Sequence, residues 1–276
     1  MANFQGADAG LRELALFAGA GGGILGGKLL GWRTVCAVEW EPYPASVLAQ
    51  RQNDGLLAPF PIWDDVRTFD GHPWRGFVDV VSGGFPCQDI SVAGKGAGID
   101  GARSGMWHHM ARIVDEVRPR FVFVENSPLL VGRGLDRVLA DLAGLGFNAR
   151  WCVMGATAAD LPHGRERFWM VAYPSEVRRE LAEHDAEERR HNPHRHARKA
   201  AEGSKRWPYR FDGTFPPHHL HDWEIPEGGS VRGIDGLAEW MDRVSAVGNG
   251  QVPTVAAKVV RLLMPEACNT PNVDVI

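Results

Sequence analysis

The sequence is poor in cysteine and has no long uninterrupted apolar run. No pair among its four cysteines has CxxC spacing, which argues against a zinc ribbon or a redox motif. At 276 residues the chain is not a small secreted scaffold held by disulfides, so a reducing, cytoplasmic compartment is expected. Glycines and Lys28 interrupt the apolar residues 14–31, which excludes a membrane span or a signal peptide there. The cysteines are Cys36, Cys87, Cys152 and Cys268.

The chain also lacks a large excess of positive or negative charge, because it contains 30 Lys and Arg residues and 34 Asp and Glu residues. The distribution along the chain is uneven. Residues 189–210 carry eight basic side chains and one acidic one, whereas residues 211–242 carry one basic and seven acidic ones. The net charge of −4 therefore does not exclude nucleic-acid binding, which needs only one positive face.

What the sequence does contain is an alternation of short apolar strands with helices. This pattern predicts an α/β fold whose parallel sheet is covered by helices on both faces. The pattern stops near Pro174, so we expect one α/β domain formed by residues 1–174 and 243–264. Residues 175–242 then form a small inserted lobe, and residues 265–276 a tail. The expected strands are 14–18, 34–38, 78–82, 121–124, 151–154 and 168–172, and the expected helices are 24–30, 44–52, 106–117, 135–145 and a last one from about 254.

A glycine turn at residues 19–23 connects the first expected strand to the first helix. Such a turn lets backbone N–H groups approach a ligand closely, and Gly21, Gly23 and Gly26 fit the GxGxxG dinucleotide pattern. Glu39 ends the next strand, where an acid can hydrogen-bond a ribose. S-adenosylmethionine and NAD both carry that ribose, so this region leaves both open, together with a glycine turn that binds nothing.

Cys87 lies just after the expected strand 78–82, at the end of the sheet where α/β proteins bind ligands. A partly exposed thiol there can act as a nucleophile. In contrast, Cys36 and Cys152 lie in or beside apolar strands and are expected to be buried. The glycine-rich residues 94–105 follow Cys87 and are expected to form a lid over the site.

Charged and polar pairs flank two later strands. Glu125 and Asn126 follow the strand 121–124, and they either share a site with the nucleophile or form a capped surface turn. Arg165 and Arg167 alternate along one face, which suits a phosphate or a base edge, although a solvated charge run has the same pattern.

In order and spacing these segments resemble the motif series of the DNA cytosine-5 methyltransferases. The resemblance covers roughly residues 14–173 and 243–263. It departs from the family at Ser127, where valine is usual, and at residues 162–164, which lack the common glutamine; the segment before the last motif is weak. The motifs that carry it are Phe17-Ala18-Gly19-Ala20-Gly21-Gly22, Glu39-Trp40, Asp65-Val66, Gly84-Phe85-Pro86-Cys87-Gln88, Glu125-Asn126, Arg165-Glu166-Arg167 and Gly248-Asn249-Gly250-x-x-Pro253.

The resemblance implies a Rossmann-like methyltransferase sheet and methyl transfer from S-adenosylmethionine to carbon 5 of a flipped cytosine in duplex DNA, through a covalent bond from Cys87 to C6. The implied catalytic residues are Cys87, Glu125, Arg165 and Arg167. The implied cofactor contacts are Phe17, Gly19, Ala20, Gly21, Gly22, Glu39, Trp40, Asp65, Val66, Pro86, Met106, Asn249 and Gln251. Among them, the resemblance places Glu39 at the ribose and Trp40, Asp65 and Val66 at the adenine. The implied DNA contacts in the main domain are Gln88, Ser91, Arg103 and Asn126.

Residues 175–242 stand where the family places its target-recognition region. Basic residues there are expected to contact DNA phosphates, although part of the run also fits a solvated helix face. No metal is expected, because the histidines at 218, 219 and 221 lack a diagnostic ligand spacing. The expected phosphate contacts are Arg195, Arg198, Lys199, Lys205 and Arg206.

Double-stranded DNA is thus the expected partner, with a monomer as the default and no membrane association. The target sequence and a partner restriction endonuclease stay open. Three other functions also stay open: methylation of RNA, an NAD-dependent oxidoreductase suggested by the glycine pattern, and a DNA-binding relative without activity.

Overall fold

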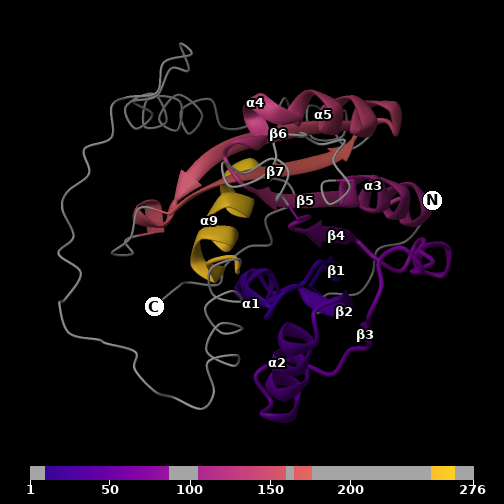
Figure 1. Ribbon diagram of the computed structural model, residues 1–276, viewed down its shortest axis with the longest axis vertical. Coiled ribbons are helices and arrows are strands. Elements are labelled where there is room, and N and C mark those ends of the chain that lie inside the picture. Colours follow the sequence, from indigo (N-terminus) through magenta and orange to yellow (C-terminus); the bar gives the residue numbers. More distant parts are fainter. Residues whose placement is uncertain (1–9, 87–104, 160–164, 176–249, 265–276) are drawn as a thin grey trace, which may run out of the picture.

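The computed structural model describes residues 10–86, 105–159, 165–175 and 250–264. Within them, seven strands form one sheet in the order β3-β2-β1-β4-β5-β7-β6 (Figure 1). The strands are β1 Arg12–Leu16, β2 Arg33–Val38, β3 Ile62–Trp63, β4 Val80–Gly83, β5 Phe121–Asn126, β6 Phe147–Gly155 and β7 Glu166–Pro174.

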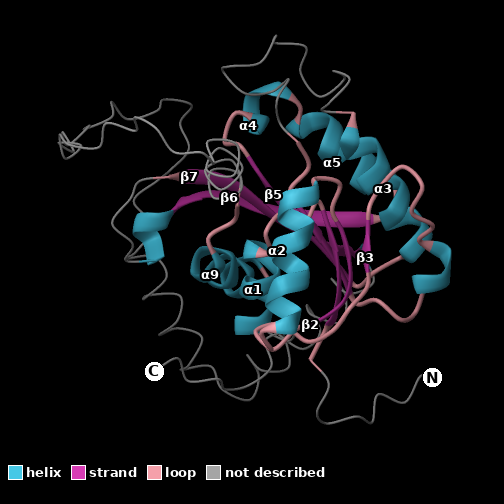
Figure 2. Cartoon of the chain, turned by 60° about the horizontal axis from the view of Figure 1, so that its bottom comes forward, coloured by secondary structure: helices cyan, strands magenta, loops and turns pink. Residues whose placement is uncertain are grey.

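Helices cover both faces of this sheet (Figure 2). Helices α3, α4 and α5 pack on one face, whereas α1, α2 and α9 pack on the other. No helix within the described residues is long and apolar enough to cross a membrane. The helices are α1 Gly22–Leu29, α2 Pro42–Asn53, α3 Met106–Val117, α4 Leu130–Arg133, α5 Leu135–Gly144 and α9 Pro253–Leu263, with short 3-10 helices η1 His72–Trp74 and η3 Ala156–Ala159.

The central strand β5 illustrates why both faces are covered. Successive side chains of a strand point to opposite faces. Val122 and Val124 therefore pack with α3, α4 and α5, whereas Phe121 and Phe123 pack with α9. A strand buried on both faces reads as an almost continuous apolar run, as this one does.

The sheet is not wholly parallel, which corrects the expectation drawn from the strand and helix alternation. The pairings from β3 through to β5 are parallel, but β7 runs antiparallel to both β5 and β6. Only ten residues, 156–165, separate β6 from β7. That is shorter than the dozen or more residues that a parallel crossover needs. The first residues of β7 consequently lie beside the last residues of β5.

Other differences from the sequence expectations are small. β5 includes Glu125 and Asn126, which pair with Trp169 and Phe168, so these two residues end the strand instead of following it. Sequence patterns did not predict β3 or α4, which are two and four residues long. Segments this short do not develop a hydrophobic period.

The glycines of α1 allow a close approach to the segment that opens α9. A Cβ atom on Gly22 would lie 2.1 Å from the backbone oxygen of Gln251, and one on Gly26 would lie 2.9 Å from the Cβ of Ala256. Gly21 precedes the helix with a φ of 86°, a conformation that favours glycine. These glycines thus bring the C-terminal segment against the first turn of α1.

One buried carboxyl lies inside the sheet, near the amino end of β1. Glu13 is 1% exposed and accepts hydrogen bonds from Thr34 Oγ1 at 2.7 Å and Ser82 Oγ at 2.6 Å. It therefore links β1 to both neighbouring strands. Burial raises the pKa of Glu13, and the two hydroxyl donors oppose this rise.

The raised pKa of Glu13 makes stability depend on pH. Because this pKa is higher in the folded chain than in the unfolded chain, the carboxyl stabilises the fold at acidic pH, and this contribution is lost as the pH rises through the folded-state pKa. Glu13→Gln does not ionise and can still bond both hydroxyls. Between the pKa of Glu13 in the unfolded chain and its pKa in the folded chain, the unfolding free energy of Glu13→Gln should rise relative to that of wild type. We expect this difference to grow by about 1.4 kcal/mol per pH unit.

Urea unfolding at pH about 4.5 and about 8 measures this difference. Asp136→Asn, which removes an exposed carboxyl at the start of α5, is the control for net charge. An unfolding free energy of Glu13→Gln that parallels wild type at both pH values would show that Glu13 does not titrate as expected.

Candidate active site

The candidate site lies where the parallel strands β1, β2, β4 and β5 end, here termed the carboxyl edge. The turn after β1 has an unusual backbone: Phe17 has a φ of 51°, which is rare for a residue with a side chain, and Gly19 has a φ of 54°. A Cβ atom on Gly19 would meet nothing within 4 Å. The surface of the turn is therefore open at Gly19. Strained backbone of this kind is concentrated at ligand-binding and catalytic sites.

Glu39, directly after β2, is tied to this turn. Its buried carboxylate accepts hydrogen bonds from the N–H of Gly19 at 2.6 Å and from the N–H of Glu41 at 2.8 Å. Burial raises the pKa of Glu39, and these N–H groups oppose the rise. The acid that was predicted to bind a ribose thus lies against the glycine turn, and the next residue, Trp40, is 61% exposed.

Asp65 and Val66, the predicted adenine contacts, follow β3. Both carboxylate oxygens of Asp65 lie 2.9 Å from Nε of Arg67, and this hydrogen bonding lowers the pKa of Asp65. The guanidinium of Arg67 lies 5.0 Å from the ring centroid of Trp40. Arg67 therefore contacts two groups to which the family resemblance assigns the adenine. Sequence reasoning missed Arg67, although an arginine two residues after a loop carboxylate is a signal for such a pair.

The strand that leads to Cys87 lies against Glu125. A Cβ atom on Gly84 would be 2.7 Å from Oε2 of Glu125, so a larger residue at this position would have to displace the carboxyl. Pro86 is half-buried and is the last described residue before Cys87. The carboxyl group of Glu125 is therefore in contact with a residue three positions before the predicted nucleophile.

Asn126 holds the same segment through its amide group. Asn126 Nδ2 donates to the backbone oxygen of Phe85 at 3.0 Å, and Asn126 Oδ1 accepts from the N–H of Ser127 at 2.8 Å. The ring of Phe85 is buried and lies 5.4 Å from that of Trp107 in α3, centroid to centroid. Asn126 thus has a structural role in addition to the DNA contact predicted for it.

Glu125 is the centre of the charged part of the site. It is 6% exposed, which rules out the surface turn considered for this pair, and Nε of Arg167 lies 3.0 Å from its Oε1. Burial raises the pKa of Glu125 to about 7, against the opposing effects of Arg167 and Arg165. Burial also lowers the pKa of Arg165. A carboxyl that titrates near neutrality can hold or release a proton under ordinary conditions.

Gln251, just before α9, reaches between the glycine turn and β4. A Cβ atom on Gly23 would lie 2.7 Å from Gln251 Oε1, and one on Gly84 would lie 3.5 Å from Gln251 Nε2. Oε1 is buried and has no hydrogen-bond partner among the described residues. A buried acceptor without a donor costs free energy, so this oxygen suits a donor group on a ligand.

Two of the other cysteines behave as the sequence predicts. Cys36 and Cys152 are buried and free, and burial raises the pKa of each thiol to about 11.

Met106, a predicted cofactor contact, is half-buried in the first turn of α3. The following predicted site residues lie outside the described residues: Cys87, Gln88, Ser91, Arg103, Arg195, Arg198, Lys199, Lys205, Arg206 and Asn249, together with residues 94–104 of the expected lid.

Solved structures include a protein with a similar fold. The solved structure of the Entamoeba histolytica methyltransferase EhMeth covers 59% of this chain and 53% of its own length, with a TM-score of 0.51. At 14% sequence identity this likeness concerns the fold alone, and it confirms the methyltransferase-like α/β sheet that was expected.

Relatives found by sequence have a higher sequence identity to this chain. The Type II methyltransferase M.Eco47II of Escherichia coli is 34% identical over 181 residues, covering 62% of this chain and 40% of the relative. The Type II methyltransferase M.HhaI of Haemophilus parahaemolyticus is 31% identical over 173 residues, covering 61% of this chain and 50% of the relative. The matched region thus spans half or less of each relative. The profile of one family matches residues 11–210, so this chain belongs to the C-5 cytosine-specific DNA methylase family.

Proposed function

We propose that this chain transfers a methyl group to carbon 5 of a cytosine in duplex DNA, with S-adenosylmethionine as the donor and Cys87 as the nucleophile. One observation carries the proposal. The carboxyl group of Glu125 is buried, bonded to Arg167, and in contact with Gly84 three residues before Cys87. An acid that titrates near neutrality beside a nucleophile is the pairing that addition to a pyrimidine ring needs.

The residues around the glycine turn fit the proposed donor. The open surface at Gly19 and the exposed ring of Trp40 suit an adenosine, and Glu39 suits its ribose hydroxyls. The unsatisfied Oε1 of Gln251 suits a hydrogen-bond donor such as an ammonium group. When bound, S-adenosylmethionine supplies a methyl group on a positively charged sulfur.

Carbon 5 of cytosine is a poor nucleophile, and covalent catalysis overcomes this. The thiolate of Cys87 adds to C6 and forms a sulfur–carbon bond, while the ring electrons shift toward N3 and C5 becomes nucleophilic. After C5 has gained the methyl group, a base removes the C5 proton. The electrons of that C–H bond restore the double bond, and the thiolate leaves.

The charged residues stabilise the intermediate. Glu125 shares its proton with N3 as negative charge develops there, an effect that contributes about 10²–10⁴-fold to the rate. Arg167 donates to O2 of the ring. Arg165 supplies positive charge that stabilises the thiolate form of a nucleophile bound at this edge of the sheet.

A cytosine inside a duplex must leave the base stack before Cys87 can reach it, which costs about a few kcal/mol. We propose that residues 175–242 select the target sequence and that their basic side chains contact phosphates. Residues 1–174 and 243–264 form the catalytic domain. The recognition residues, like Cys87, lie outside the described residues.

Transfer of a labelled methyl group tests the proposed function directly. The protein is incubated with labelled S-adenosylmethionine and either duplex DNA or tRNA, and label is expected in the DNA. Bisulfite sequencing of DNA from cells that express the protein then identifies the methylated positions. Label in tRNA alone would establish an RNA methyltransferase instead, and calorimetric binding of NADH in place of S-adenosylmethionine would establish an oxidoreductase.

A further inference from the structure

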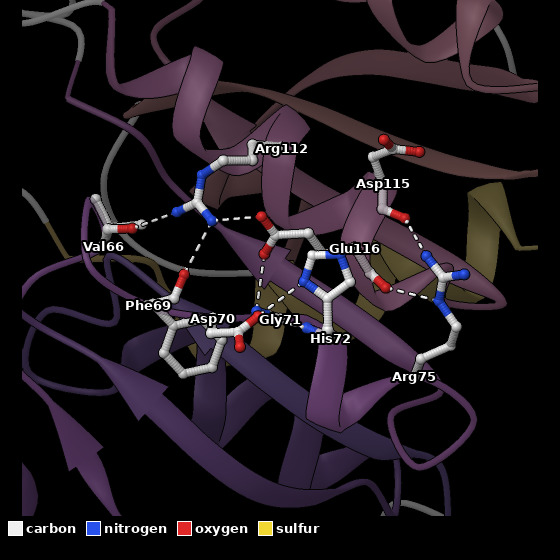
Figure 3. Close-up of polar contacts among 9 residues, drawn as sticks. All are labelled: Val66, Phe69, Asp70, Gly71, His72, Arg75, Arg112, Asp115 and Glu116. Atoms are coloured by element: carbon white, nitrogen blue, oxygen red, sulfur yellow. Dashed lines mark hydrogen bonds and ion pairs between the residues drawn. The ribbon is translucent and has the colours of Figure 1, made fainter.

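Helix α3 holds the loop that carries Asp65 and Val66 through one arginine (Figure 3). Arg112 Nη2 donates to the backbone oxygen of Val66 at 2.8 Å, and Nη1 donates to the backbone oxygen of Phe69 at 2.9 Å. Both acceptors are main-chain atoms, so these bonds fix the path of the loop itself. The arginine lies more than 40 positions away from its acceptors in the sequence, which makes this a tertiary contact between two separate parts of the site.

Glu116, one turn further along α3, completes the contact. Its Oε1 lies 2.6 Å from Arg112 Nη1, and its Oε2 accepts from the N–H of Gly71 at 2.8 Å (Figure 3). A Cβ atom on Gly71 would lie 2.9 Å from the Cβ of Glu116, so the loop is pressed directly onto the helix. Arg112 and Glu116 thus form hydrogen bonds with the backbone at both ends of residues 66–71.

These contacts differ from an ordinary surface ion pair. The side chains of Arg112 and Glu116 are 29% and 12% exposed, and their hydrogen bonds are charge-assisted, which makes them stronger than neutral ones.

A metal site formed by Asp70, His72 and Glu116, whose ligand atoms lie within 4.8 Å of one another, is disfavoured. The guanidinium of Arg112 already neutralises Glu116, and His72 Nδ1 already lies 2.8 Å from Asp70 Oδ1.

We infer that Arg112, oriented by Glu116, is a positioning residue for the part of the site that binds the adenine of the methyl donor. The inference rests on the proposed function. Arg112 does not itself contact the donor. It holds the backbone of Val66, and with it the neighbouring Asp65, in a position from which Asp65 and Trp40 can both contact the adenine. Displacing positioning groups by about 1 Å can cost up to about 100-fold in a binding or catalytic constant.

The test compares donor binding by Arg112→Met and wild type. Methionine retains the hydrocarbon packing of the side chain but has no donors. We expect the Kd for S-adenosylhomocysteine, measured by calorimetry, to rise about tenfold, and the KM for S-adenosylmethionine to rise with it. The kcat at saturating donor should stay within about twofold, because no group that touches the cytosine has moved.

A second ligand separates positioning from general weakening of the fold. S-inosylhomocysteine has a carbonyl in place of the adenine amine, so a correctly placed Asp65 should bind it more weakly than the adenosine form. We expect Arg112→Met to lose most of this discrimination. A merely structural role for Arg112 would lower the melting temperature and leave the ratio of the two Kd values unchanged, which would overturn the inference.

Arg75→Met is the matched control. Arg75 also makes two hydrogen bonds from this loop to α3, through the backbone oxygens of Glu116 and Asp115, but at the end remote from Val66. We expect its Kd to change less than twofold, and an equal rise in both variants would overturn the specific role of Arg112. Should Arg112→Met not fold, Arg112→Lys and Glu116→Gln carry the same comparison. Failure of the wild-type protein to bind S-adenosylhomocysteine would instead refute the proposed function.

Discussion

Replacing Cys87 with serine is expected to abolish methylation of duplex DNA while leaving donor binding nearly unchanged. The serine hydroxyl has a far higher pKa than a thiol, so almost none of it is present as the nucleophilic anion. We expect the rate to fall by at least about 10⁴-fold, the scale of loss when a catalytic nucleophile is removed. Radiolabel transfer measures the rate, and calorimetry with S-adenosylhomocysteine measures the binding.

Cys152→Ala is the matched control for this variant. Cys152 is buried in β6 with a raised pKa, so its removal should affect packing and leave the rate of transfer intact. A duplex with 5-fluorocytosine at the target position provides a direct test of the covalent step. Fluorine does not leave C5 as a cation, so the wild-type protein should remain bonded to this DNA in denaturing electrophoresis. Turnover by Cys87→Ser, or the same bonded complex with that variant, would contradict the mechanism.

Glu125→Gln is expected to lower the rate of methyl transfer by about 10²–10⁴-fold, the usual contribution of a general acid. The amide has the shape of the carboxyl and can still form hydrogen bonds with a cytosine, but it has no proton to share with N3. We therefore expect the affinity for duplex DNA to change little. Single-turnover kinetics with saturating DNA separates this chemical effect from binding.

The pH dependence of the rate provides a second readout of Glu125. The protonated form is the active one in the proposed mechanism, and burial raises its pKa to about 7, so the wild-type rate should fall as the pH rises above about 7. This alkaline limb should be absent in Glu125→Gln. Glu166→Gln, which changes an exposed acid next to Arg167, is the control and should retain both the rate and the limb. An alkaline limb that persists in Glu125→Gln would assign the titration to another group.

Much of the fold was predictable because secondary structure arises within short windows of sequence. The apolar spacing of residues 106–117 predicted a helix, and α3 spans Met106–Val117. The burial of Cys36 and Cys152 followed in the same way from the apolar strands around them. β3 was missed because two residues are too few to show any period.

The candidate site was predictable where it depends on strand ends. Glu39 and the residues leading to Cys87 both follow expected strands, and parallel strands end at one edge of a sheet. Arg67 and Arg112 were missed, because their interactions depend on a loop whose path no motif describes. Arg112 bonds an oxygen 46 positions earlier in the chain, and no local pattern encodes such a pairing.

The sequence by itself determined the order of strands and helices, the glycine turn and the polar residues at the strand ends, because periodicity and local sterics set these. The direction of β7 was decided only by the tertiary structure. A strand has the same two-residue period whether it pairs in parallel or antiparallel, so its own residues do not specify its direction. In a parallel arrangement Arg167 would have lain at the far edge of the sheet. The antiparallel pairing of β7 with β5 brings its guanidinium to 3.0 Å from Glu125.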